Sequence, residues 1–217
     1  PLWAFYINDP EMPTLAIQLI ESQIHLQSFI LILISTFIAV PFFIKLKKGK
    51  LISFQIPSVL FQLFIILPIF DLGDQLRQLP LRKASDLIIE SQKEDEPIAM
   101  VGINKPSIHF YTRKIVFYEA NDAISLTNLA ERLSNEKRNN WEPQPINIKE
   151  SSKTFILLID KFTSKYSHWM NLNPEVLGEF GIYKVWRLKR YNLERRSNYL
   201  KSEGVIPNWQ VPRPERL

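Results

Sequence analysis

Residues 26–46 read LQSFILILISTFIAVPFFIKL, and residues 51–70 read LISFQIPSVLFQLFIILPIF. Each run has about 20 residues, and at a helical rise of about 1.5 Å per residue it covers about 30 Å, the thickness of a bilayer's hydrocarbon layer. Between residues 26 and 70 the four charges are all lysines within positions 45–50. The two runs therefore predict a hairpin of two transmembrane helices. The alternative, two buried helices of a large soluble core, is uncommon in a domain of this size.

The four lysines in the connection, residues 45–50, predict its side of the membrane. Residues 1–44 contain no Lys or Arg, and Asp71 and Asp74 follow the second run. Short loops that carry lysine lie in the cytoplasm. We therefore expect an inner-membrane protein with residues 1–25 and all residues after about 71 on the extracytoplasmic, periplasmic side.

The N-terminal segment carries amphipathic rings at Trp3, Phe5 and Tyr6, which favour the headgroup layer of a membrane. Residues 16–24 predict a short helix lying at the same surface. Membrane lipids are therefore an expected partner.

A polar stripe runs along the second hydrophobic run, because Gln55, Ser58 and Gln62 are spaced by three and four residues. Amides are costly against lipid tails and are expected to face other helices. This favours further transmembrane helices upstream, so we expect the chain, which begins at Pro1, to be part of a longer protein. The alternative is that Gln55 and Gln62 find partners within this one hairpin.

After residue 71 short helical and strand patterns alternate. Such alternation predicts an extracytoplasmic α/β domain over residues 71–190, with a mostly parallel sheet covered by helices. Residues 135–152 are polar, contain Pro143 and Pro145, and predict a loop; Gly178 and Gly181 predict a turn. The expected helices are 76–92, 107–112, 125–134 and 161–170, and the expected strands are 98–103, 115–118, 154–159 and 182–188.

The net charge of +5 arises from the C-terminal end. Residues 187–217 hold eight Lys or Arg and three Glu, whereas the rest of the chain is balanced. The basic tail, residues 191–217, is expected to be solvated and partly disordered, with attraction to anionic headgroups as the alternative. A charge confined to one end does not indicate a nucleic-acid partner. The chain has no cysteine, which excludes disulfides, Cys zinc sites and a thiol nucleophile.

One segment superficially resembles a phosphate-binding loop, because Gly102, Lys105 and Ser107 follow an expected strand and precede an expected helix. However, no glycine precedes the lysine, and Pro106 lacks the N–H group that a phosphate cradle uses. A strand-to-helix turn, with Pro106 or Ser107 starting the helix, fits the same residues better.

Catalytic and metal-binding patterns are missing from the sequence. His25, His109 and His168 are isolated, and there is neither an HExxH nor a GxSxG motif. Asp9 and Glu11 form a carboxylate pair of the kind that glycosyl transfer needs as a base, but their spacing is typical of any polar loop. We therefore assign no catalytic residue and no metal ligand, and leave the substrate-binding residues unknown.

Three segments carry a resemblance to a known family: RQLPLR at 77–82, EPIAMVG at 96–102 and KPSIHFYT at 105–112. Together they resemble the C-terminal part of bacterial, especially cyanobacterial, family 39 glycosyltransferases. These are relatives of aminoarabinose transferase and of the dolichyl-phosphate-mannose protein mannosyltransferases. The resemblance covers most of residues 1–190.

The resemblance implies a membrane glycosyltransferase with many transmembrane helices, a polyprenyl-phosphate sugar donor, and an extracytoplasmic α/β domain after the last span. In that family the catalytic carboxylates lie in the first extracytoplasmic loop, and some members use a divalent metal. The residues of this chain do not include that first loop, so no catalytic residue and no cofactor is carried over to them. The chain is expected to be inactive alone.

Two functions follow from these observations. The first is the C-terminal portion of a glycosyltransferase that moves a sugar from a polyprenyl-phosphate donor to a lipid or protein acceptor. The second is a two-span anchor that presents an α/β ligand-binding or sensory domain. In the second case the candidate ligand contacts are Lys105, His109, Tyr111 and Arg113, with turn and surface residues as the commoner interpretation of all four.

Overall fold

The computed structural model describes residues 9–45, 55, 57–93, 96–135 and 153–210. The described residues fall into two compact units, one within Pro1–Leu79 and the other within Pro80–Leu217. Several predictions lie outside the described residues. These concern the aromatic residues Trp3, Phe5 and Tyr6, nearly all of the lysine connection and nearly all of the loop 135–152.

The first unit consists of helices. Helix α1 (Leu15–Glu21) is joined to α2 (Ile24–Lys45) through Gln23, whose φ of 53° turns the chain between the two helices. A π-helical segment, η2 (Gln62–Ile66), continues into α4 (Leu67–Arg77). Within this unit α2 packs against η2, and α1 packs against α4. An ion pair of 2.8 Å between Glu11 and Arg77 adds to these contacts.

The described residues contain one helix that by itself is long and apolar enough to cross a membrane, Pro57–Ser91, with 35 residues. At about 1.5 Å per residue it is about 52 Å long, more than a bilayer core requires. A second candidate combines Leu15–Glu21 with Leu26–Val40 across a bend of 51°. Both hydrophobic runs thus contain helix, but the hairpin itself stays a prediction.

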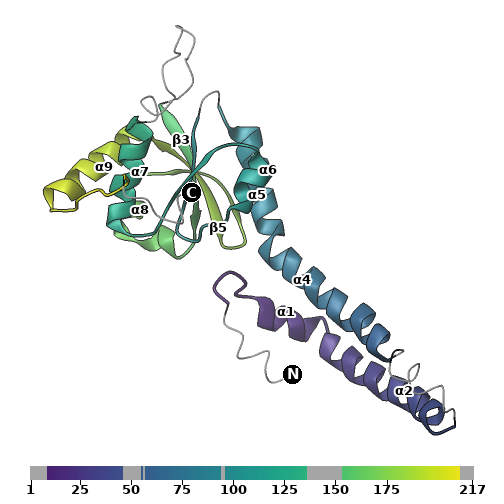
Figure 1. Ribbon diagram of the computed structural model, residues 1–217. Helices are drawn as coiled ribbons and strands as arrows, with labels where there is room; N and C mark the ends of the chain where they lie inside the picture. Colours follow the sequence, from purple (N-terminus) through teal and green to yellow (C-terminus); the bar gives the residue numbers. More distant parts are fainter. Residues whose placement is uncertain (1–8, 46–54, 56, 94–95, 136–152, 211–217) are drawn as a thin grey trace. The chain divides into compact units, whose positions relative to one another are not determined.

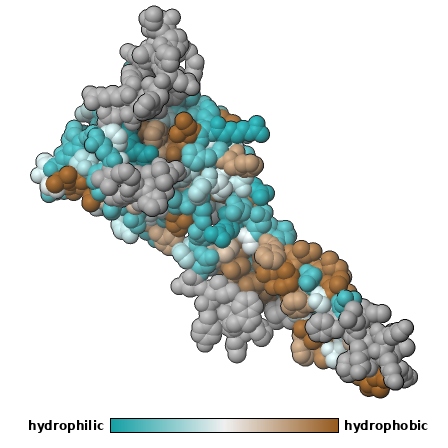
Figure 2. Space-filling view, in the orientation of Figure 1, coloured by the Kyte–Doolittle hydropathy of each residue, from teal (hydrophilic) through white to brown (hydrophobic). Residues whose placement is uncertain are grey.

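Apolar side chains cover the surface of the first unit, as the brown area of Figure 2 shows. Phe37 is 78% exposed and Phe70 is 70% exposed. Gln55, Ser58 and Gln62 are exposed as well, so the described residues give no support to pairing of these glutamines within the hairpin. A surface of this kind needs lipid or further helices to cover it.

The second unit is an α/β domain whose described strands form one five-stranded sheet in the order β2-β1-β3-β5-β4. Strands β2, β1 and β3 are parallel to one another, whereas β5 is antiparallel to both β3 and β4. The strands are β1 (Ile98–Val101), β2 (Val116–Glu119), β3 (Thr154–Asp160), β4 (Glu175–Phe180) and β5 (Tyr183–Lys189).

Helices cover both faces of this sheet (Figure 1). One face carries α5 (Leu79–Ser91) and α6 (Ser107–Thr112), and the other carries α7 (Ala123–Asn135), α8 (Ser167–Met170) and α9 (Arg190–Ser202). Because successive residues of a strand point to opposite faces, β3 contributes to two separate cores. Phe155, Leu157 and Ile159 pack under α7 and α9, while Ile156 and Leu158 pack under α5.

The expected α/β class is confirmed, but two details of the sheet were wrong. The sheet is parallel only over β2, β1 and β3, since β4 and β5 form a hairpin that adds to β3 in the antiparallel sense. Of the two glycines expected to mark a turn, only Gly181 lies in the hairpin turn, with a φ of 56°. Gly178 lies inside β4 at a bulge.

The interpretation of the C-terminal end as a partly disordered tail was wrong for residues 190–202. These residues form α9, which buries Leu193, Ser197 and Leu200 at helical spacing. Leu193 and Leu200 belong to the core beneath α7. The helix expected over residues 161–170 is instead two short pieces, η3 (Thr163–Lys165) and α8, separated by Tyr166 in an extended conformation.

Candidate functional site

β1 and β3 are neighbouring parallel strands, so their carboxyl ends lie side by side at the same end of the sheet. The chain leaves β1 toward α6 on one face and leaves β3 toward α8 on the other face (Figure 1). In open α/β sheets a crevice at such a point is the usual place for a ligand. It is therefore the first candidate site in the domain.

The side chain of Asp160 fills this crevice. Its carboxylate accepts hydrogen bonds from the N–H groups of Ile103 (3.1 Å), Phe162 (2.9 Å) and Thr163 (2.8 Å), and from the Thr163 hydroxyl (2.6 Å). The residue is only 2% exposed. The oxygens of Asp160 therefore occupy the place that the oxygens of a bound anion take in nucleotide-binding sheets.

Gly102 allows this close approach. Its φ is 89°, and a Cβ at this position would overlap the carboxylate of Asp160 and the hydroxyl of Thr163. Its N–H donates to the carbonyl of Glu119 at 3.2 Å. The Asp160 side chain thus fills the crevice and connects the end of β3 to the end of β1.

The segment that resembled a phosphate-binding loop is a structural turn. The N–H of Ile103 donates to Asp160, and the N–H of Lys105 donates to the sulfur of Met100 at 3.3 Å. Pro106 precedes α6, which begins at Ser107, as predicted. Two of the N–H groups of the turn therefore already have protein partners.

The four residues expected as ligand contacts of a sensory domain do not converge on a cavity. His109 Nδ1 lies 2.8 Å from the carbonyl of Lys114, and Arg113 is exposed at the end of α6 with a φ of 53°. The carbonyl of Lys105 accepts from the Tyr118 hydroxyl at 3.1 Å, and burial raises the pKa of Tyr118, which keeps the hydroxyl protonated as a donor.

Tyr111, the fourth of these residues, packs against the core beneath α5. Its hydroxyl accepts from Arg82 Nε at 3.3 Å, and the Arg82 guanidinium lies 5.7 Å from its ring centroid. These contacts join α6 to α5. The four residues are therefore better explained as parts of the α6 turn than as a binding site.

The remaining candidates from the sequence also have structural partners. The carboxylate of Asp9 accepts from the N–H of Glu11 at 2.8 Å, and Glu11 pairs with Arg77. His168 Nε2 lies 2.7 Å from the carbonyl of Asn121. Over the described residues, no three His, Asp or Glu side chains lie close enough together to hold a metal ion.

At the opposite end of the sheet a buried ion pair joins three elements. Arg187 Nε donates to Glu96 Oε1 at 3.0 Å, and the same guanidinium donates to the carbonyl of Ser91 at the end of α5. Burial by itself raises the pKa of Glu96. Hydrogen bonds from the Thr154 and Arg187 side chains and from the N–H of Lys93 outweigh burial and lower the pKa below its ordinary value.

A second ionic network holds the end of β2 against α7. Glu119 is buried and pairs with Arg132 at 3.0 Å. Asn128, one turn earlier on α7, exchanges hydrogen bonds with Asn208 at 3.0 and 2.7 Å. The chain after α9 is thereby tied to α7.

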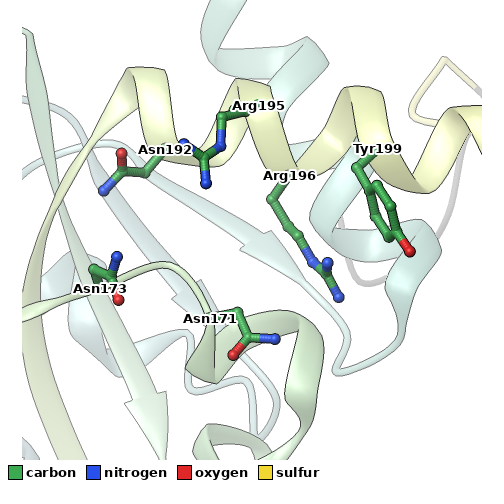
Figure 3. Close-up of a pocket in the computed structure, with 6 residues that line it drawn as sticks. All are labelled: Asn171, Asn173, Asn192, Arg195, Arg196 and Tyr199. Carbon is green, nitrogen blue, oxygen red and sulfur yellow. The ribbon is translucent and has the colours of Figure 1, made fainter.

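One cavity in this domain opens between α9 and the segment that follows α8 (Figure 3). Its volume is about 280 Å³. No motif in the sequence marks this cavity, although positions 192, 195, 196 and 199 follow helical spacing and put polar residues on one face of α9. The residues that line it are Asn171, Asn173, Asn192, Arg195, Arg196 and Tyr199.

Comparison with known proteins gives two findings. Residues 91–204 match the family described as the C-terminal domain of cyanobacterial RgtA-type glycosyltransferases. The fold resembles that of ArnT from Cupriavidus metallidurans in the apo state, with a TM-score of 0.54 over 86% of this chain at 14% identity. The chain spans about a third of the length of that structure, since it covers 33% of it. A search among curated proteins finds no match.

Proposed function

The chain belongs to the family of the C-terminal domain of cyanobacterial RgtA-type glycosyltransferases, and on that premise we propose that it is the C-terminal portion of an integral-membrane glycosyltransferase. The proposed enzyme moves a sugar from a polyprenyl-phosphate donor to a lipid or protein acceptor. The family match is the observation that carries this proposal.

The likeness to ArnT supports a larger protein. That likeness extends over 86% of this chain but over only 33% of the ArnT structure. The exposed apolar surface of α2 and of residues 57–70 is the kind that further transmembrane helices would cover. We propose that those helices belong to the same protein and carry the catalytic carboxylates and any divalent metal.

The role of the α/β domain in this proposal is structural support outside the membrane. The side chain of Asp160 fills the crevice of its sheet, and His109 on α6 makes a hydrogen bond to the carbonyl of Lys114 within the domain. In this proposal the domain does not itself supply the reacting groups.

The test is sugar transfer in reconstituted vesicles that contain a radiolabelled polyprenyl-phosphate sugar. We expect transfer by the full product of the gene and none by the purified 217-residue chain. Turnover by the 217-residue chain would show that the chain holds its own active site. A gene whose reading frame adds no hydrophobic segments upstream of the Pro1 codon would instead favour the two-span anchor.

The 217 residues contain no cysteine, so a cysteine introduced into this chain is its only thiol and makes the membrane orientation directly testable. Lys48→Cys places a thiol in the lysine connection, and Ser167→Cys places one at an exposed position of the α/β domain. With a membrane-impermeant maleimide on intact cells, we expect labelling of S167C but not of K48C.

Permeabilised cells provide the control, because both variants should then react. The reverse pattern in intact cells, with K48C labelled and S167C protected, would contradict the proposed periplasmic location of the domain.

A further inference from the structure

The cavity beside α9 is built by two segments of the α/β domain. Four of its residues come from one face of α9, and two come from the segment just after α8. Asn192 Nδ2 donates to the carbonyl of Leu172 at 3.0 Å, which fixes that segment against the helix. Asn173 has a φ of 50°, so the chain turns beneath the cavity.

The lining is rich in hydrogen-bond donors and contains no carboxylate. Figure 3 shows Arg195 and Arg196 extending from α9 toward the segment that carries Asn171 and Asn173. Within the described part of the chain neither arginine has an acidic partner, and Arg196 Nε is shielded from solvent without a hydrogen bond. Two guanidinium groups at one cavity thus lack the anion that would balance them.

Tyr199 positions one of these cations. The guanidinium of Arg196 lies 4.9 Å from the centroid of the Tyr199 ring, within the range of a cation–π contact. A hydrogen bond to Glu203 raises the pKa of Tyr199, so this hydroxyl is directed to the end of α9. Arg196 is therefore held in place before any ligand arrives.

Guanidinium groups bind phosphate through paired, charge-assisted hydrogen bonds. A cavity of about 280 Å³ is close to the lower end of the range for small-molecule sites, about 300 Å³. A lone phosphate fills only part of it, given that a water molecule occupies about 30 Å³ in the liquid. Asn171 and Asn173 also line the cavity, and amides both donate to and accept from hydroxyl groups.

We propose that the cavity between α9 and residues 171–173 is a binding site for a phosphorylated sugar. In this site Arg195 and Arg196 hold the phosphate, and Asn171 and Asn173 bind the sugar hydroxyls. The site lies wholly within the α/β domain and requires no chemistry there. It stands independently of the proposed transferase activity.

The test is calorimetric titration of the whole chain in detergent micelles with glucose 1-phosphate. Inorganic phosphate and glucose are titrated separately, so that the charge and the sugar are assessed one at a time. We expect saturable binding of glucose 1-phosphate, at least tenfold weaker binding of inorganic phosphate, and no binding of glucose.

The variants R195Q and R196Q should each weaken glucose 1-phosphate binding at least tenfold. Arg195 is exposed, so R195Q keeps its fold and remains decisive even if R196Q does not fold. The matched control is R113Q, which removes the same charge from an exposed arginine just after α6 and should leave the affinity unchanged.

Each other result overturns a stated part of the proposal. Equal weakening by R113Q would mean a general charge effect and no site. Equal affinity for inorganic phosphate would remove the sugar from the proposal. No binding of either phosphate compound would overturn it entirely, whether or not the full-length protein transfers sugar.

Discussion

Replacing Asp160 with alanine is expected to lower the free energy of unfolding of the α/β domain by about 4 kcal/mol. The substitution leaves three backbone N–H groups and one hydroxyl without their acceptor in a site that is 2% exposed. A buried donor left without a partner costs about 1–3 kcal/mol, and water entering the vacated space offsets part of the total. The measurement is urea unfolding of the chain in micelles, followed by near-ultraviolet circular dichroism.

Three further variants make this result specific. Asp160→Asn keeps one carbonyl acceptor, so its effect should be intermediate. Thr163→Val removes the hydroxyl donor and with it one of the hydrogen bonds to Asp160, so it should lower the free energy of unfolding by about 1 kcal/mol. Asp86→Ala, at an exposed position of α5, should change stability by less than about 0.5 kcal/mol. A D160A variant as stable as D86A would mean that the carboxylate does not hold β1 to β3.

Replacing Arg187 with methionine is expected to cost about 3.5 kcal/mol at neutral pH. Methionine fills much of the same space but leaves the carboxylate of Glu96, whose side chain is fully buried, without its cation. Breaking a buried pair on one side typically costs about 3–5 kcal/mol. Lys184→Met is the matched control, because Lys184 pairs with Glu179 near the surface at 3.3 Å and such pairs contribute less than about 1 kcal/mol.

The pH dependence of this effect has a definite sign. In the native chain the pKa of Glu96 is lowered in the folded state, so the stability it contributes is present above its ordinary pKa of 4.5 and is lost on acidification through the folded pKa. In R187M, burial without the guanidinium raises that pKa. The difference in unfolding free energy between the native chain and R187M should therefore be largest at pH 7 and narrow toward pH 4. A difference that stays constant with pH would assign the loss to packing.

Four of the five described strands could be predicted because they are short apolar runs bounded by turn residues. The run at 154–159 became β3, and the run at 98–103 became β1. β4 was missed because half of its residues are exposed, none is buried, and it contains Gly178, a residue type that is typical of turns. The antiparallel pairing of β5 with β4 could have been predicted from the length of their connection, because two residues are too few for a parallel crossover.

Helix α9, in contrast to these strands, could not be predicted from the sequence. Polar and charged residues dominate its sequence, and such a composition is also typical of disorder. Its buried residues, Leu193, Ser197 and Leu200, are too few to outweigh that composition in a sequence pattern. What orders the helix is contact with α7 and β5, which no local pattern contains.

Neither polar site could be found from sequence alone. Asp160 and Ile103 lie 57 positions apart, and Glu96 and Arg187 lie 91 positions apart. Only the order of the strands brings these groups together. The family resemblance, by contrast, depended on short local segments around α5, β1 and α6, and the family match confirmed it.

The bulge in β4 has a consequence for crowded copies of this protein. β4 is an outer strand of the described sheet, and an open strand edge can recruit another chain into an aggregate. The irregularity between Val176 and Gly178 interrupts the regular row of N–H and C=O groups, and Glu175 and Glu179 place negative charge along it. Two such edges do not match in spacing. Copies of the domain at high local concentration are therefore hindered from joining their sheets through β4.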